Sequence, residues 1–185
     1  MIGKILLALA ASLALASPAD AHTITVMRSN SDAADCFRAA EDDGARRESL
    51  QLCDRALADV TLASHDRMAT FVNRGILRSR TGDFDGAFAD FDSALAIEPN
   101  HPDAMINRGI TMLAAGRPID ESKAVIEQGL AREPARPWVG YYGRAVANEM
   151  AGRDSAAYHD YRRALALRPG WRLASEALAR FSVRP

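Results

Sequence analysis

Apolar and small side chains recur at helical spacing along most of the chain, and the clearest stretch covers residues 68–101. Its pattern predicts two amphipathic helices joined by a turn at 81–83, with Gly82 inside the turn. Small residues such as Gly75 and Ala94 stand where the two helices would cross. Pro99 closes the stretch, because proline inside a helix loses a hydrogen bond and clashes with the preceding turn. The stretch is therefore predicted to form a helical hairpin.

The same pattern returns at a fixed distance. The tetrapeptide Asn-Arg-Gly-Ile occupies 73–76 and, 34 residues later, 107–110, and Gly-Arg-Ala-Val at 143–146 is a weaker copy. Each copy is followed by its own turn glycine and closing proline. The predicted units are therefore 68–101, 102–137 and 138–171, with two extra residues in the middle unit; a weaker first pair covers 30–63, and a helical tail at 172–182 would cap the array.

This period, with small residues at the helix crossings and a closing proline, resembles the tetratricopeptide repeat family. The resemblance covers about three quarters of the chain. It implies an all-α fold, an α-solenoid of four helix-turn-helix units with a C-terminal capping helix. It also implies a non-catalytic protein–protein interaction scaffold that needs no cofactor.

Members of this family line a concave groove with the first helix of each unit, so the resemblance also suggests binding residues. The implied groove residues are Ala69, Val72, Asn73, Ile76, Arg80, Asp103, Ile106, Asn107, Ile110, Leu113, Val139, Tyr142, Val146, Glu149 and Met150. Many of them are apolar. Of the residues that a carboxylate-clamp member uses to hold a C-terminal acid, only the two asparagines match, and the lysines are missing. The expected ligand is therefore an amphipathic helix or an apolar extended peptide, with the asparagines bonding to its backbone.

Other occupants are compatible with an apolar groove. The chain's own arm at 22–33, the C-terminal helix, or a second copy in a homodimer would each cover it. A self-associating structural protein is thus the alternative function. Trp138, Tyr141 and Tyr142 are candidate anchors for a partner, although Trp138 begins its predicted helix and fits a packing role equally well.

A recurring arginine is predicted to be structural. Arg74 and Arg144 stand at a position that faces the second helix of the same unit, and Asp90 and Asp160 follow sixteen residues later. An unpaired charge there would cost several kcal/mol, which favours buried Arg–Asp pairs over an anion-binding arginine ladder. Arg108 has no such acid in its own unit, and its expected partner is Asp90 or Glu121.

The two cysteines occupy nearly the same facing positions in the first pair. Cys36 and Cys53 are 17 residues apart on helices folded back across Gly44, so they can approach within bonding distance. We expect a structural disulfide rather than a redox pair, since the unit at the end of an array packs against one neighbour only.

The first 21 residues predict export. Lys4, an apolar run over 5–16 and the small-x-small triplet Ala19-Asp20-Ala21 are typical of a cleaved signal peptide. The alternative, an uncleaved anchor, is less favoured because a run of about a dozen residues falls short of the roughly 20 that span a bilayer. The mature protein would then be periplasmic or secreted, without membrane insertion.

Other functions lack a sequence signal. A net charge of −1 argues against nucleic-acid binding. No catalytic motif is present, so the chain is not expected to be an enzyme. Metal binding is not expected either: the histidines do not pair at helical spacing, and the acidic stretch from Asp83 to Asp92 lacks the central glycine and closing glutamate of a calcium loop.

Overall fold

The computed structural model describes residues 31–41 and 47–181. The predicted signal peptide, the arm at 22–30 and the turn residue Gly44 lie outside the described residues. Over the described ranges the structure is all-α, as predicted, with nine helices and no strand. The helices are α1 Ser31–Glu41, α2 Arg47–Ala58, α3 Ser64–Arg80, α4 Phe84–Ile97, α5 Pro102–Ala114, α6 Ile119–Leu130, α7 Pro137–Met150, α8 Asp154–Leu167 and α9 Arg172–Ala179.

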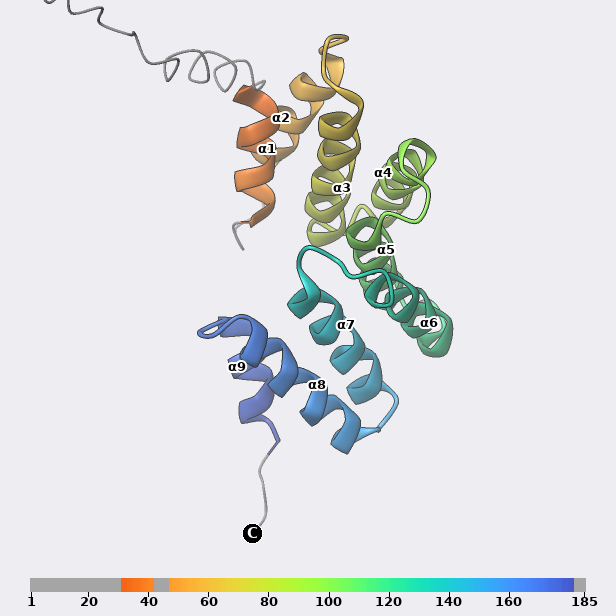
Figure 1. The fold of residues 1–185 in the computed structure, drawn as a ribbon, viewed down its shortest axis with the longest axis vertical. Helices are drawn as coiled ribbons and strands as arrows, with labels where there is room; N and C mark the ends of the chain where they lie inside the picture. Colours follow the sequence, from red (N-terminus) through yellow and green to blue (C-terminus); the bar gives the residue numbers. More distant parts are fainter. Residues whose placement is uncertain (1–30, 42–46, 182–185) are drawn as a thin grey trace, which may run out of the picture.

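The helices form successive antiparallel hairpins stacked into a curved array (Figure 1). Within each hairpin the two helices pack together, and α1 packs against α3, α3 against α5 and α5 against α7. The first helices line the inner side of the curve, and α1 and α9 lie at its two ends (Figure 1). One helix begins earlier than expected: Ser64 and His65, expected in a linker, belong to the first turn of α3.

Small residues let the helices cross closely, as their positions in the sequence predict. A Cβ atom on Gly75 would lie 2.8 Å from the Phe91 ring of α4, and one on Gly109 would lie 2.6 Å from Ile126 of α6. Phe91 and Ile126 are themselves fully buried. The turn between α3 and α4 needs a glycine for a different reason, because Gly82 has a φ of 83°.

The predicted ion pairs form, and each aspartate takes a second donor. Arg74 donates to Asp90 at 2.6 Å, and Asp90 also accepts from Arg78 at 2.9 Å. The Asp90 side chain is 3% exposed, so both carboxylate oxygens are satisfied inside the protein. Burial would lower the pKa of Arg74, but its hydrogen bonds to Asp90 and Asp54 outweigh burial and raise it.

The last hairpin repeats this arrangement. Arg144 donates to Asp160 at 2.6 Å, and Asn148 donates to the same carboxylate at 3.2 Å. The hydrogen bond to Asp160 raises the pKa of Arg144 against the effect of its burial. The prediction for Arg108 was wrong: it pairs at 3.1 Å with Asp92 on α4, because α4 packs against α5 and presents this exposed carboxylate to it.

Cys36 on α1 and Cys53 on α2 lie at disulfide distance, with their Cα atoms 4.9 Å apart. Both side chains are fully buried and pack with Ala40 and Leu77. The link therefore joins the two helices of the first hairpin at the point where they meet α3.

Helix α9 closes the other end of the array. Ala177 is buried against Tyr161 of α8, and the Phe181 ring lies 5.8 Å from the Tyr161 ring. The Tyr161 hydroxyl donates to Glu149 at 2.6 Å, and Glu149 also accepts from Arg180 at 2.9 Å. Across the described ranges, no helix combines the length and apolar character needed to span a membrane.

Candidate functional site on the concave face

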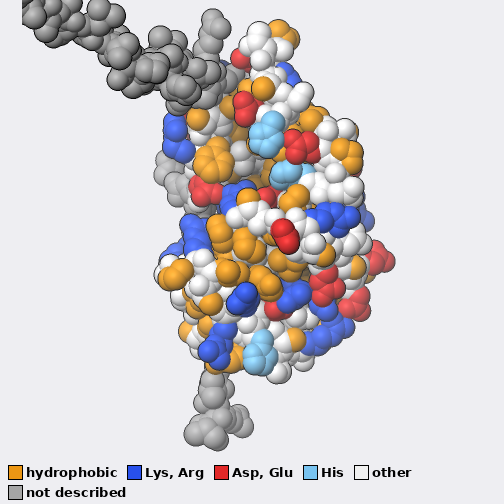
Figure 2. Space-filling model, viewed as in Figure 1, with side chains coloured by type: hydrophobic (Ala, Val, Ile, Leu, Met, Phe, Trp, Pro, Cys, Tyr) orange, Lys and Arg blue, Asp and Glu red, His pale blue; other side chains and the backbone are white. Residues whose placement is uncertain are grey.

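The inner side of the curve carries two cavities. Figure 2 shows the molecule from the same direction as Figure 1, with apolar side chains gathered near the middle of this face and Lys and Arg side chains around them. Neighbouring turns of α1 and α3 contribute to both cavities. The two cavities therefore belong to one continuous surface.

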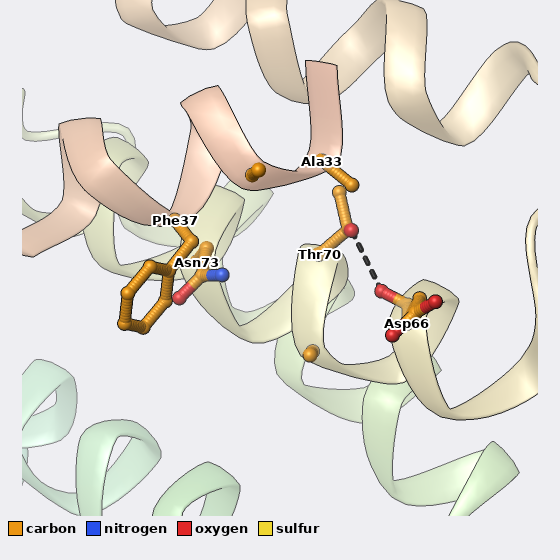
Figure 3. Close-up of a pocket in the computed structure, with 7 residues that line it drawn as sticks. Ala33, Phe37, Asp66, Thr70 and Asn73 are labelled. Carbon is orange, nitrogen blue, oxygen red and sulfur yellow. Dashed lines mark hydrogen bonds between the residues drawn. The ribbon is translucent and has the colours of Figure 1, made fainter. Parts of the chain in front are cut away.

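The α1–α3 cavity has a volume of about 250 Å³. Its walls are Ala33, Ala34, Phe37, Asp66, Ala69, Thr70 and Asn73. Figure 3 shows the Phe37 ring beside the Asn73 side chain. The Thr70 hydroxyl points away from these two side chains and donates to the Asp66 carbonyl at 2.7 Å. Phe37 is 46% exposed, although it is a large apolar side chain. This cavity is mostly apolar, and the Asn73 amide in its wall is itself buried, with 4% of the residue exposed.

The central cavity is smaller, about 90 Å³, and lies where the two ends of the array approach each other. Its walls are Ala40, Glu41, Ile76, Arg80, Asn107, Arg136, Trp138, Val139, Arg168, Trp171 and Leu173. They come from α1, α3, α5, α7 and α9 and from the segments before α7 and after α8.

Two of the central arginines tie the end of α1 to the rest of the wall. Arg80 donates to the Ala40 carbonyl at 2.9 Å, and Arg136 donates to the Glu41 carboxylate. Arg136 also lies 3.9 Å from Asp103. The Arg136–Glu41 pair joins residues 95 positions apart, so it holds the first and fourth hairpins in register across the concave face.

The third arginine is held by aromatic rings. The Arg168 guanidinium lies 5.8 Å from the Trp138 ring centre and 5.6 Å from the Trp171 ring centre. Cation–π contacts of this kind contribute about 0.5–1 kcal/mol at exposed sites. The Trp138 Nε1 is buried and has no acceptor in the described part of the chain.

The predicted groove residues divide into three groups. The following line one of the two cavities: Ala69, Asn73, Ile76, Arg80, Asn107 and Val139. Their role in binding stays a prediction. Asn107 already donates to the Asp103 carbonyl at 2.8 Å, so its free capacity is one amide hydrogen and the carbonyl oxygen.

A second group is buried, and the assignment of these side chains to an open groove was wrong. Val72 is 3% exposed, Ile106 0%, Leu113 5% and Asp103 7%. Ile106 fills the space above Gly129, where a Cβ atom would lie 2.7 Å from its Cγ1. Helix α5 turns Asp103, Ile106 and Leu113 into the interior, because it is covered on both sides by α3 and α7, whereas Val72 is buried on α3.

The third group lies outside both cavities. Tyr142 stacks on Trp171 with ring centres 4.9 Å apart, and Glu149 faces α9 rather than the groove. Ile110 packs on Gly143, Val146 packs against the buried Ala147, and Met150 is 49% exposed.

Several cavity residues were missed by the sequence analysis, and two had a signal. Arg168 stands before a closing proline where the other units carry Glu98 and Glu133, so the charge is reversed at that position. Arg136 lies in the segment lengthened by the two extra residues of the middle unit. Glu41, Trp171 and Leu173 carried no such signal.

No cluster of three or more His, Cys, Asp or Glu side chains able to hold a metal ion occurs within 31–41 and 47–181. The chemistry available on this face is hydrogen bonding, ion pairing and apolar contact.

The structure is therefore an α-solenoid of helical hairpins whose concave face carries the two cavities. Residues 80–141, from the end of α3 into α7, match the sequence model of the tetratricopeptide repeat family. This stretch therefore consists of tetratricopeptide repeats, as the 34-residue period predicted. No curated protein is similar enough to the chain to count as a match.

Tetratricopeptide repeats are protein-interaction modules and are typically non-catalytic. The array thus has a role in protein–protein interaction.

Proposed function

We propose that this protein binds a peptide segment of another protein along its concave face. The observation that carries the proposal is the pair of adjoining cavities, both lined by α1 and α3 and both rich in apolar side chains. Surfaces that expose apolar side chains beside a few fixed polar groups are typical of binding sites. The two cavities have the size of side chains, which favours an extended segment of apolar residues over a globular partner.

The amides on this face supply contacts for a peptide backbone. Asn73 points into the α1–α3 cavity beside Phe37, and Asn107 lines the central cavity (Figure 3). An extended segment has unpaired backbone donors and acceptors that such amides can satisfy. Apolar side chains of the peptide would contact Phe37 and Ala69 at one end and Ile76 and Val139 at the other.

We propose that this binding takes place in the cell envelope or outside the cell. Support comes from the signal-like pattern of residues 1–21 and from the cysteine pair at disulfide distance, which suits an oxidising compartment. The mature protein would work there as a scaffold or adaptor.

The test is selection from a displayed library of random peptides, using the mature chain and two matched variants. Val139→Glu places a charge in the wall of the central cavity. Val125→Glu makes the same change on the half-buried side of α6, which touches neither cavity. We expect wild type and V125E to enrich the same peptides and V139E to lose them. Equal enrichment by all three proteins would refute the concave face as the binding site.

Self-association is the competing proposal, and the exposed Phe37 at the rim of the α1–α3 cavity is the observation in its favour. Sedimentation of the mature chain at two concentrations separates the two. A mass that rises with concentration and falls in Phe37→Ser would favour the homo-oligomer.

A further inference from the structure

One arginine of the central cavity has no acid beside it in the described part of the chain. Arg80, Arg136 and Arg168 line the cavity together with one carboxylate, that of Glu41. Arg136 donates to that carboxylate, and Arg80 donates to the Ala40 carbonyl. The Arg168 backbone bonds to Ala164 and Trp171, but its side chain makes no ion pair and no hydrogen bond with the described residues. The Arg168 guanidinium is therefore suited to pair with one further negative group.

The position of Arg168 is fixed without an acid. Its guanidinium lies over the rings of both Trp138 and Trp171, 5.8 and 5.6 Å from their centres. A cation–π contact uses none of the five N–H donors of the guanidinium. The ring contacts thus position Arg168 and leave its hydrogen-bonding capacity free, and Arg suits paired bonds to a carboxylate better than Lys does.

Apart from the charged groups and the Asn107 amide, the wall is apolar. Ile76, Val139 and Leu173 line the same space, which has a volume of about 90 Å³. That space suits a carboxylate with its neighbouring methylene groups.

The cavity lies in the middle of the binding surface rather than at its end. The α1–α3 cavity adjoins it on one side, through the neighbouring turns of α3 that carry Asn73 and Ile76. On the other side the wall reaches α7 and α9 through Val139 and Leu173, and the Trp171 ring lies 4.9 Å from the Tyr142 ring of α7. A peptide that crosses the face would place an internal residue here.

We propose that the central cavity binds the carboxylate of an internal Asp or Glu side chain of the peptide, with Arg168 as its direct partner. The inference rests on the proposed function and adds that the bound apolar peptide must contain an Asp or Glu. The bound acid pairs with Arg168, and the apolar wall contacts its methylene carbons.

The test uses the same mature chain and two displayed libraries of random peptides. One library fuses the peptides at their C-terminal ends, so that only internal acids are offered. The other presents free C-terminal ends. We expect the first library to enrich one Asp or Glu position flanked by apolar residues.

Binding is then measured with a synthetic enriched peptide, acetylated and amidated, and with its acid-to-amide counterpart. Trp138 and Trp171 are the two tryptophans of the chain, and both line the cavity, so intrinsic fluorescence reports on this place alone. We expect the acidic peptide to change the emission and its amide counterpart to bind at least about tenfold more weakly.

The matched variants are Arg168→Gln and Arg162→Gln. Arg162 is also exposed and stacked, 5.7 Å from the Tyr158 ring, but it lies outside both cavities. R168Q should weaken binding of the acidic peptide about tenfold and leave the amide peptide unchanged, and R162Q should change neither. The comparison of the two peptides on wild type needs no variant, so it holds even if R168Q folds poorly.

Other outcomes separate the failure of this inference from the failure of the proposed function. Enriched peptides without an acid, bound equally by R168Q, would overturn the inference and leave the peptide-binding face standing. Enrichment from the free-end library alone would assign the cavity to a terminal carboxylate instead, which also overturns it. If the wild-type chain enriches peptides no better than V139E does in either library, both this inference and the proposed function are overturned.

Discussion

The first and last hairpins join the same facing positions by different means. In α1–α2 the link is the Cys36–Cys53 pair, in which both side chains are fully buried. In α7–α8 the link is Arg144–Asp160, in which the arginine side chain remains 28% exposed. A disulfide carries no charge and can be buried without hydrogen bonds, whereas both charged groups of an Arg–Asp ion pair must be hydrogen-bonded when they leave water. The comparison shows that one architectural position tolerates either chemistry when its polar atoms are satisfied.

The α3–α4 and α5–α6 hairpins complete the series. Asp90 is the most buried of the aspartates in these pairs and accepts from Arg74 and Arg78. In α5–α6 no pair forms between the helices, and Ile126 packs on Gly109 instead. The array therefore keeps its geometry through backbone crossings at small residues, while the linking chemistry varies.

The largest expected effect is from Asp90→Ala. It removes the buried carboxylate that Arg74 and Arg78 share and leaves them only the exposed Asp54 and Asp83, and breaking a buried pair from one side costs about 3–5 kcal/mol. Urea unfolding should show this loss. The control is Asp92→Ala, two residues along α4, where the pair with Arg108 is exposed and contributes about 0–1 kcal/mol. Equal losses in the two variants would contradict the buried role of Asp90.

Next in size is the double variant Cys36→Ala/Cys53→Ala. Opening a 17-residue loop should cost about 3 kcal/mol. The end hairpin packs only on α3, so we expect hydrogen-exchange protection to fall mainly in α1 and α2 and to persist in α7 and α8. Thiol titration of the unfolded, non-reduced protein is the companion measurement. Two reactive thiols would show that the disulfide is absent.

A smaller effect is expected at the other end of the comparison. Asp160→Ala should lower stability by about 1–3 kcal/mol, because Arg144 and Asn148 lose their acceptor. The double variant Arg144→Met/Asp160→Met should restore most of this loss, since no charge is left unpaired. A double variant that is less stable than D160A would contradict this reason. It would show that the attraction between Arg144 and Asp160 stabilises the hairpin directly, beyond keeping the Arg144 charge from being unpaired.

The smallest effect is a pH dependence. Burial would raise the pKa of Glu149, but hydrogen bonds from Arg180 and Tyr161 outweigh burial and hold it below its usual value of 4.5. Its contribution to stability is therefore present above pH 4.5 and lost as the pH falls through the lowered pKa. Glu149→Gln should cost about 1 kcal/mol at pH 7 and progressively less as the pH falls through the lowered pKa. The control is Glu176→Gln, which removes an exposed ion pair within α9 and should leave the stability unchanged both at pH 7 and at low pH.

The repeat pattern predicted the fold because each anchor residue indicates one local structural feature. Gly75 and Gly109 indicate close crossings, Pro99 and Pro169 indicate helix ends, and the spacing of Arg74 and Asp90 indicates facing positions. The site was predicted less well. Ile76 and Ile110 hold equivalent positions, each directly after a crossing glycine, yet Ile76 lines a cavity and Ile110 packs on Gly143.

The sequence by itself determined the period, the hairpins, the cysteine pair and the two Arg–Asp pairs, since all of these depend on residues within one unit. Only the tertiary structure decided what the concave face contains. Its central cavity brings Glu41, Arg80, Arg136 and Arg168 together from four places in the chain. The physical reason is the curvature of the stack, which depends on how neighbouring hairpins pack and brings the two ends of the array toward each other.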